Sequence, residues 1–233
     1  MGIKRHIPNF ITLLNLLCGC IAIVFASHGD FELTFYFVCG GIFLDFFDGF
    51  FARLFKVSSP LGLQLDSLAD MVTSGVTPGF VMYHMMSNNN DVASWFPYLG
   101  FLITLGSCYR LANFNIDTRQ TDSFIGLPTP ANALFILSLP LVLNYSDSLM
   151  LLELLVNPWV LLAISVFSAF ILNAEIPLFS LKIKKVGFKG NELPILFLLY
   201  SVLMIVFFTY SALPLIILSY ILLSVINNKF LHR

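Results

Sequence analysis

Long apolar runs separated by short polar connections make up most of this chain. A run such as 35–55 is apolar around the helix except for Asp45, Asp48 and Arg53, and its length of about 20 residues is what a helix needs to cross a bilayer. Trp95, Tyr98 and Trp159 stand near the ends of such runs, where membrane interfaces favour aromatic side chains. The pattern therefore predicts eight membrane-spanning helices, at about 10–27, 33–55, 67–86, 96–116, 129–146, 155–174, 193–210 and 212–228.

The composition is that of an integral membrane protein. Of the 233 residues, 58% are hydrophobic and 11% are charged, whereas soluble domains carry about 25% charged residues. Eight spans use roughly 160 residues, which leaves no room for a separate soluble domain. We expect residues 1–233 to form a single transmembrane domain, an all-α polytopic helical bundle whose last three spans occupy about 155–228. The formal net charge of -1 argues against a nucleic-acid partner.

The basic residues fall only on alternate connections between the predicted spans. The connections around 30–32, 88–91 and 147–153 carry acidic residues but neither Lys nor Arg. Since Lys and Arg accumulate on cytoplasmic loops, both termini are predicted to be cytoplasmic and the number of spans to be even. The residues behind this prediction are Lys4, Arg5, Arg53, Lys56, Arg110, Arg119, Lys182, Lys184, Lys185, Lys189, Lys229 and Arg233.

Four carboxylates lie in or beside the second and third predicted spans: Asp45, Asp48, Asp66 and Asp70. A charge at the centre of a span costs about 2.5 to 3.5 kcal/mol, so such residues point to a function. Spacings of three and four residues place each pair on one helix face. Alternatively, these aspartates could have a structural role, capping helices or forming salt bridges. Only Arg53 and Lys56 are near them in the sequence, however, and two cations are too few partners for four carboxylates. Oxygen ligands without His or Cys favour a hard cation, and two Mg²⁺ or Mn²⁺ ions would neutralise the four charges, with Ca²⁺ also able to occupy the site.

The segment 45–70 resembles the complete signature of the CDP-alcohol phosphotransferases, and it reads Asp45-x2-Asp48-Gly49-x2-Ala52-Arg53-x8-Gly62-x3-Asp66-x3-Asp70. The small side chains at 49 and 52 clear space for a nucleotide, Arg53 offers a guanidinium to a diphosphate, and Gly62 permits close backbone approach. Helix packing is an alternative role for Ala52. The resemblance implies that all four aspartates hold metal, that Asp70 is also the catalytic base, and that the CDP-linked donor contacts Asp48, Gly49, Ala52, Arg53, Gly62 and Asp66.

Further stretches resemble the integral-membrane phosphatidylserine synthases of bacteria and archaea. They lie at 8–19, 65–78, 109–115 and 124–128, and the resemblance ends near 133. It implies a donor, CDP-diacylglycerol, and an acceptor, L-serine, with CMP as the leaving group. Where these synthases read R-L-A-R-F-N, this chain has Asn113 in place of the second arginine.

Serine is a zwitterion, so its site should offer a donor to the carboxylate. We predict this role for Arg110, which could equally contact lipid phosphate or simply orient the helix in the membrane, and we predict hydrogen bonds from Asn113 and Asn115. Thr12 and Asn15, three residues apart in the first span, and Thr73 in the third either line the cleft or bond neighbouring helices. Gly126 belongs to a turn at 124–130 that either borders the serine pocket or only begins the next helix.

These observations predict a membrane enzyme that transfers the phosphatidyl group from CDP-diacylglycerol to the serine hydroxyl. One alternative keeps the reaction and changes the acceptor to glycerol 3-phosphate or inositol phosphate, whose additional charge would demand a more basic pocket. A remote alternative is a divalent-cation transporter built on the same aspartates. The resemblance also suggests a homodimer in the cytoplasmic (inner) membrane, with membrane lipid around it and the active site facing the cytoplasm.

Overall fold

The computed structural model describes residues 6–57, 59–88, 92–117, 119, 125–179 and 191–231, and the regular structure in those ranges is helical. The all-α prediction is therefore confirmed. The elements are α1 (Ile7–Ser27), α2 (Phe31–Phe55), α3 (Pro60–Asp70), the π-helix η2 (Met71–Val76), α4 (Thr77–Ser87), the 3-10 helix η3 (Phe96–Phe101), α5 (Leu102–Phe114), α6 (Thr129–Tyr145), α7 (Leu149–Val156), α8 (Pro158–Asn173), α9 (Glu192–Phe208), the 3-10 helix η4 (Thr209–Ser211) and α10 (Ala212–Leu231).

Each predicted span coincides with a helix or with a run of consecutive helices. In the part of the chain that is described, α1, α2 and the stretch Glu192–Asn228 are long and apolar enough to cross a membrane, and α7 with α8 forms a fourth such stretch that bends by 76°. The other three predicted spans fall on the shorter α6, on α3–η2–α4 and on η3–α5, which are not among these stretches, so the count of eight spans stays a prediction. The chain is thus a helical membrane protein. Its orientation stays a prediction, and Lys4, Arg5, Arg233 and the lysines at 182–189 lie outside the described residues.

The connection between α2 and α3 is defined at both ends by local sequence. Lys56, which follows α2, adopts a left-handed conformation with φ of 53°, and its backbone N–H bonds back to the helix. Ser59 then caps α3, accepting a 3.0 Å hydrogen bond from the Gly62 N–H, and Pro60 occupies the first turn, where its missing N–H has no cost. This short connection places the ends of two aspartate-bearing helices side by side. It also starts the third helix at residue 60, earlier than the predicted 67.

A π-helix interrupts the rod formed by α3 and α4, directly after Asp70. Pro78 lies in the first turn of α4. A proline within a helix has no N–H to donate, and its ring collides with the carbonyl of the residue four positions earlier, here Ser74. The wider turn accommodates Pro78 without ending the helix, and the Thr77 hydroxyl donates a 2.9 Å hydrogen bond to the Val72 carbonyl within it.

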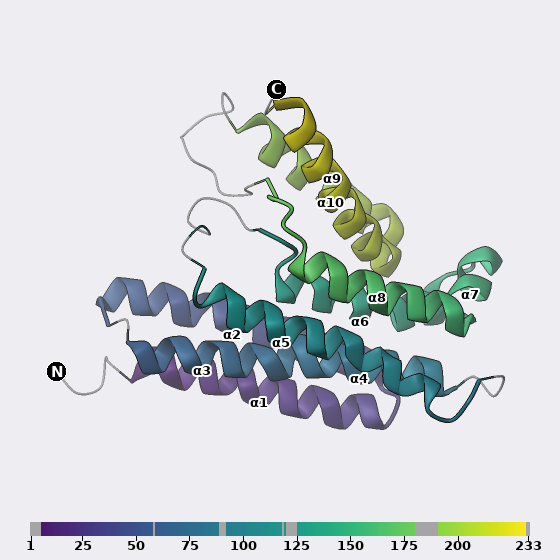
Figure 1. Ribbon diagram of the computed structural model, residues 1–233, viewed down its shortest axis with the longest axis horizontal. Coiled ribbons are helices and arrows are strands. Elements are labelled where there is room, and N and C mark those ends of the chain that lie inside the picture. The colour runs from purple at the N-terminus through teal and green to yellow at the C-terminus, as the bar shows by residue number, and fades with distance from the viewer. Residues whose placement is uncertain are drawn as a thin grey trace.

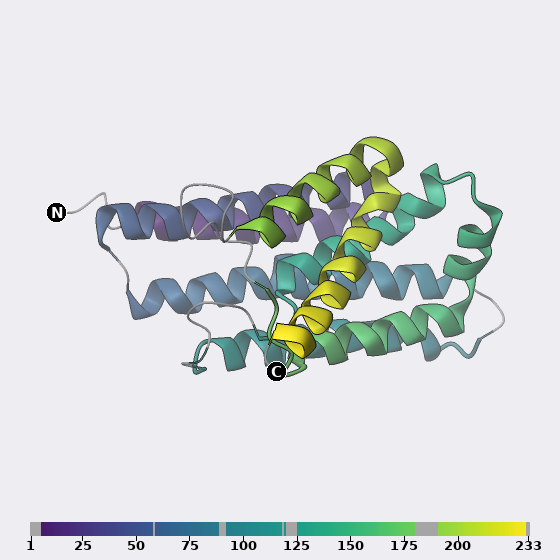
Figure 2. The same ribbon diagram turned by 90° about the horizontal axis from the view of Figure 1, so that it is seen from above.

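The helices α1 to α5 run side by side along the long axis of the molecule, while α9 and α10 rise from it at a steep angle (Figures 1 and 2). The α9–α10 hairpin is attached at both ends. Near its turn, the Tyr210 hydroxyl lies 2.8 Å from the Tyr36 hydroxyl on α2. Farther along α10, the Tyr220 hydroxyl donates a 2.9 Å hydrogen bond to the Phe179 carbonyl. The hairpin therefore supports the segment that follows α8.

That segment in turn supports the entry to α6. Ile125 forms an isolated antiparallel bridge with Pro177, and the Gly126 N–H donates a 2.9 Å bond to the Ile176 carbonyl. Gly126 has φ of 77°, and a Cβ there would lie 2.5 Å from the Leu172 carbonyl oxygen. Only glycine meets both conditions without strain. The residues that follow, 128–130, are thereby held at the end of the bundle that carries the aspartates.

Candidate active site

Three of the four predicted metal ligands meet at one point. One carboxylate oxygen from each of Asp45, Asp48 and Asp66 lies within 4.8 Å of the other two. Two of these side chains come from α2 and one from α3, so the cluster depends on the connection described above. Asp48 is buried and the other two are half-buried. Because partly buried like charges repel and the donors are all oxygen, this group suits a hard divalent cation.

Asp70 lies outside this group of three, one turn farther along α3. It is 9% exposed, and its Oδ1 accepts a 3.2 Å hydrogen bond from Nδ2 of Asn15 on α1. Asp70 nevertheless shares a cavity wall with Asp45 and Asp66. The structure thus brings all four predicted aspartates to one region and separates Asp70 from the others.

Helix α1 contacts the aspartates through two polar side chains. The Thr12 hydroxyl donates a hydrogen bond to Asp48 Oδ2, and Asn15 holds Asp70 as described above. Thr12 is 3% exposed and Asn15 is fully buried. Their spacing of three residues places both on the face of α1 that meets α2 and α3. Thr12 was predicted either to line the cleft or to bond a neighbouring helix. In the structure it does both, since it bonds Asp48 on α2 and lines a cavity.

The first cavity, of about 190 Å³, lies between α1, α2 and α3. Five of the six residues predicted to contact the CDP-linked donor line it: Asp48, Gly49, Ala52, Gly62 and Asp66. Arg53 does not line the cavity, but its guanidinium lies beside Gly49, where an added Cβ would be 3.5 Å from Arg53 Nη1. The remaining wall consists of Pro8, Asn9, Thr12, Val57, Ser59 and Leu63.

Asn9 and Ser59 were not identified from the sequence. At Gly62 an added Cβ would lie 3.2 Å from both Asn9 Oδ1 and Ser59 Oγ, so these polar atoms gather where the glycine leaves room. The available signal was the position of Asn9 in the 8–19 stretch and of Ser59 next to the proline that starts α3. Both are polar residues at helix starts, which normally indicates capping.

The second cavity, of about 200 Å³, lies on the other side of Asp66. Its charged lining residues, within the described part of the chain, are Asp45, Asp66, Asp70 and Arg110. Arg110 is 4% exposed, and its guanidinium carbon lies 5.1 Å from the centre of the Phe114 ring. The rest of the wall comes from Ser67, Leu111, Phe114, Pro128, Thr129 and Pro130. Carboxylates and a guanidinium facing one small space can bind a ligand that carries both signs of charge.

The other predicted acceptor residues do not line this cavity. The Asn115 amide donates a 2.9 Å hydrogen bond to Oγ of Ser67, and so contacts the wall. Asn113 is half-buried and lines neither cavity. Thr73 is fully buried and donates a 3.1 Å hydrogen bond to the Asn15 carbonyl. Gly126 shapes the turn beside residues 128–130.

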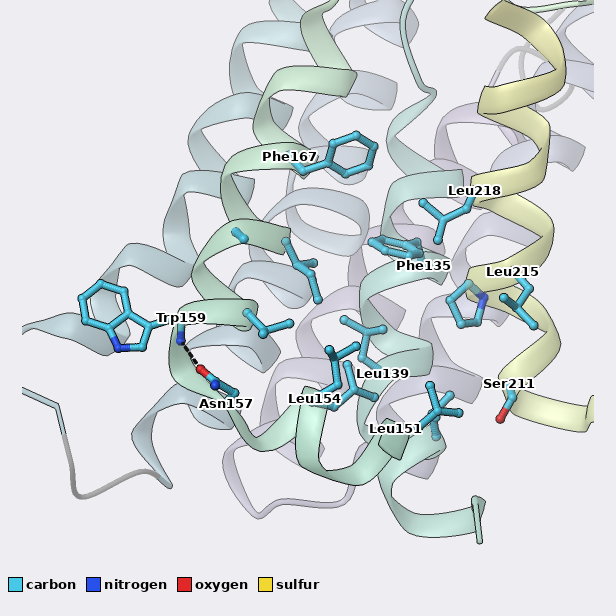
Figure 3. A pocket seen from close by; sticks show the side chains of 16 residues that line it. Phe135, Leu139, Leu151, Leu154, Asn157, Trp159, Phe167, Ser211, Leu215 and Leu218 are labelled. Carbon is cyan, nitrogen blue, oxygen red and sulfur yellow. Dashed lines mark hydrogen bonds between the residues drawn. The ribbon is translucent and has the colours of Figure 1, made fainter. Parts of the chain in front are cut away.

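The largest of these cavities lies elsewhere. It has a volume of about 660 Å³ and is bounded by α6, α7, α8 and α10 (Figure 3). Figure 3 shows Phe135 and Leu139 on α6 facing Leu215 and Leu218 on α10, with Asn157 accepting a 2.9 Å hydrogen bond from the Trp159 N–H. Its lining is almost entirely aliphatic and aromatic and includes no carboxylate. It therefore has none of the groups that acid–base or metal chemistry requires.

Comparison with known proteins identifies a family and several relatives. A model of the CDP-alcohol phosphatidyltransferase family matches residues 5–171. The chain is also similar to curated proteins named CDP-diacylglycerol--serine O-phosphatidyltransferase. The identity is 38% over 131 residues with the protein of Bacillus subtilis, covering 54% of this chain and 70% of that protein. It is 36% over 135 residues with the protein of Helicobacter pylori, covering 55% and 54%.

A third relative with the same name, from Methanocaldococcus jannaschii, is 32% identical over 138 residues, covering 59% of this chain and 62% of that protein. In two of the three cases the match therefore spans less than two thirds of the relative. The family model, in contrast, covers most of this chain, including all of the residues that line the first cavity. The chain therefore belongs to the CDP-alcohol phosphatidyltransferase family.

Proposed function

We propose that this protein transfers the phosphatidyl group of CDP-diacylglycerol to the hydroxyl of L-serine, producing phosphatidylserine and CMP. One observation carries the proposal: Asp66 forms part of the wall of two adjoining cavities, and the carboxylate cluster lies between them. A transfer between two substrates needs such an arrangement, because donor and acceptor must meet at one atom. The relatives' names support the choice of donor and acceptor.

Asp45, Asp48 and Asp66 would hold divalent cations, Mg²⁺ or Mn²⁺, with Asp70 completing a two-ion site. Bound there, such ions would neutralise the diphosphate and stabilise the leaving group. The protein contributes the placement of the carboxylates. Thr12 orients Asp48 through its hydroxyl, and the α2–α3 connection keeps Asp66 opposite the two α2 carboxylates.

The first cavity would bind the cytidine diphosphate head of the donor. Gly49, Ala52 and Gly62 keep its walls free of side chains, and Arg53 lies at its edge, where a guanidinium can pair with phosphate oxygens. The acyl chains would remain in the surrounding bilayer. The phosphorus atoms would then lie near Asp48 and Asp66.

The second cavity would bind serine. Arg110 would pair with the serine carboxylate and Asp70 would accept the proton of the serine hydroxyl. The serine oxygen then forms a bond to the phosphorus on the lipid side, while the bond from that phosphorus to the oxygen of CMP breaks and CMP leaves with the electron pair. The step is a direct displacement and needs no covalent enzyme intermediate.

The content of the second cavity favours serine over acceptors that carry a phosphate. Among its described lining residues the one cation is Arg110, facing three carboxylates. Glycerol 3-phosphate or inositol phosphate would bring about two negative charges into that setting and would need more guanidinium or ammonium groups. A single carboxylate with an adjacent ammonium, as in serine, matches the charges that are present.

The test is to follow CMP release by the detergent-purified protein supplied with CDP-diacylglycerol and Mg²⁺ or Mn²⁺. Serine, glycerol 3-phosphate, inositol phosphate or no acceptor is added, each with and without chelator. We expect release that depends on serine, stops with chelator and yields phosphatidylserine. CMP release with another acceptor but not with serine would overturn the choice of serine. CMP release that is unchanged by chelator would overturn the metal site.

The distribution of basic residues supports an active site at the cytoplasmic side of a bacterial or archaeal cytoplasmic membrane. Arg53 and Lys56, which mark a cytoplasmic connection by the distribution of basic residues, follow directly after Asp45 and Asp48 on α2. Serine would then enter from the cytoplasm and the donor from the bilayer. We also propose that the protein forms a homodimer, as the family resemblance suggests.

A further inference from the structure

We propose that Asn15 is a positioning residue that holds the carboxylate of Asp70 in the orientation required to deprotonate the acceptor. The inference rests on the proposed role of Asp70 and adds a residue outside the 45–70 signature. Asn15 lies in neither cavity wall, so it would act on the reaction only through Asp70.

The contact is a direct hydrogen bond between helices that are far apart in the chain. Nδ2 of Asn15 on α1 donates to Oδ1 of Asp70 over 3.2 Å, and the asparagine is fully buried. A carboxylate has two oxygens, so one can be held by the amide while Oδ2 serves the acceptor hydroxyl. A side chain with free rotation about its bonds would present either oxygen in many directions, and the hydrogen bond removes that freedom.

Tight packing fixes Asn15 itself. A Cβ at Gly41 on α2 would lie 2.7 Å from Asn15 Oδ1, so the amide rests against bare backbone. The Thr73 hydroxyl donates a 3.1 Å bond to the Asn15 carbonyl. A Cβ at Gly19 would lie 2.5 Å from that same hydroxyl oxygen. Asn15 therefore contacts α2 through its amide oxygen, η2 through its backbone carbonyl and α3 through its amide nitrogen.

The side-chain amide of Asn15 makes its hydrogen bond to Asp70. Within the described part of the chain, Asn15 Oδ1 has no hydrogen-bond partner, although it is buried. Leaving a buried polar atom unpaired destabilises the folded state. Asparagine is thus a poor choice for helix packing alone at this position, and a leucine of similar shape would avoid the cost. The bond to the Asp70 carboxylate is what distinguishes asparagine here.

The first test replaces Asn15 by leucine, which keeps the shape and removes the hydrogen bond. We expect kcat for serine-dependent CMP release to fall about 10- to 100-fold, the usual effect of losing a partner that orients a catalytic group, while both KM values change less than about twofold. Asn132→Leu is the matched control. Asn132 is also fully buried, also makes one interhelical hydrogen bond, accepting 2.6 Å from Ser168 Oγ, and also has one unpaired amide atom.

The second test perturbs Asn15 without changing it. Gly41→Ala introduces a methyl group 2.7 Å from Asn15 Oδ1 and 2.8 Å from Thr73 Cγ2, whereas Gly40→Ala, one position earlier on α2, introduces one into open space. We expect Gly41→Ala to lower kcat about as much as Asn15→Leu, within the same 10- to 100-fold range, and Gly40→Ala to leave it unchanged. Equal kcat in Asn15→Leu and the unmodified protein, or an equal loss in Asn132→Leu, would overturn the proposal.

A spectroscopic measurement keeps the test independent of turnover. The infrared carboxylate band that disappears in Asp70→Asn identifies Asp70. We expect that band to shift in Asn15→Leu and not in Asn132→Leu. If the unmodified protein releases no CMP with any acceptor, the proposed function fails while the band still reports on the hydrogen bond. An unshifted band in Asn15→Leu would overturn the positioning role whatever the activity.

Discussion

At the scale of single residues, the structure gives different surroundings to carboxylates that look equivalent in the chain. Asp45, Asp48 and Asp66 approach one another closely enough to share an ion, whereas Asp70 is held apart by a hydrogen bond from α1. The proposed transfer uses cations that neutralise phosphate charge and a carboxylate, Asp70, that accepts a proton in addition to completing the two-ion site. Changing Asp45 should therefore affect metal binding, whereas changing Asp70 should also remove the base.

The first prediction concerns Asp70. Asp70→Asn should lower kcat by at least about 100-fold, since a general base contributes about 10² to 10⁴. The amide keeps the shape of the carboxylate, so thermal unfolding in detergent should change little. The measurement is serine-dependent CMP release beside an unfolding curve. Turnover at the level of the unmodified protein would show that Asp70 is not the base.

The second prediction concerns Arg110. Arg110→Gln should raise the KM for serine about 10- to 100-fold, because a hydrogen bond to a charged group contributes about 1.5 to 3 kcal/mol. The KM for CDP-diacylglycerol should stay within about twofold, since Arg110 lines only the second cavity.

Arg119→Gln is the control for this change. Arg119 is exposed and pairs with Asp117 at 3.0 Å and with Glu175 at 3.5 Å, outside both cavities. These acidic partners raise the pKa of the Arg119 guanidinium, so the control removes a full positive charge. If both variants raise the serine KM equally, the effect is one of general charge and Arg110 has no specific role.

At the scale of elements, the second cavity depends on backbone hydrogen bonds between two segments that are distant in the chain, which we call the joint. The turn at 125–127 is held against residues 176–177, and residues 128–130 then form one wall of the cavity. Helix α10 contacts the same joint through the Tyr220 hydroxyl. Residues beyond the recognisable motifs thus contribute to the site by placing a backbone segment.

The third prediction belongs to this joint. Gly126→Ala should destabilise the protein by at least about 1 kcal/mol, because a Cβ is disfavoured at positive φ and would also collide with the Leu172 carbonyl. The midpoint of thermal unfolding in detergent should fall accordingly. Gly40→Ala, which meets open space on α2, should not lower it. A midpoint unchanged by Gly126→Ala would show that the turn does not constrain the fold.

At the scale of the whole molecule, two helices that carry like charges are held next to each other. The cluster of three carboxylates spans the interface between α2 and α3, so an ion bound there would link the two helices. Anything that binds the folded state alone stabilises it by mass action. Metal binding should therefore be visible as stability and not only as activity.

The fourth prediction is that divalent metal raises the unfolding temperature. At a concentration about 100 times the dissociation constant, Mg²⁺ or Mn²⁺ should add about 2.7 kcal/mol of stability, and chelator should remove it. Asp45→Asn should abolish most of this gain because it removes one member of the cluster. Thermal unfolding with and without metal provides the measurement. An equal gain in Asp45→Asn would place the ion elsewhere.

Much of the fold follows from local pattern. Apolar runs of about 20 residues predict helices because a bilayer leaves the backbone no other way to satisfy its hydrogen bonds, and the structure has helices at each predicted position. The aspartate pairs are equally local, since spacings of three and four residues on a helix put side chains on one face whatever surrounds it. The family resemblance rests on that same short segment, and the family comparison confirms it.

Only the tertiary structure decided which of these side chains contact one another and which line the cavities. Asn15 and Asp70 are 55 residues apart, and nothing in either local pattern indicates that they bond. Thr73 was predicted at the acceptor site with helix bonding as its alternative, and it lies buried against α1, away from both cavities. Contacts of this kind depend on how closely helices approach and at what rotation. That geometry is determined by the packing of many distant side chains at once, whereas helix formation and shared faces are determined within a few residues of the chain.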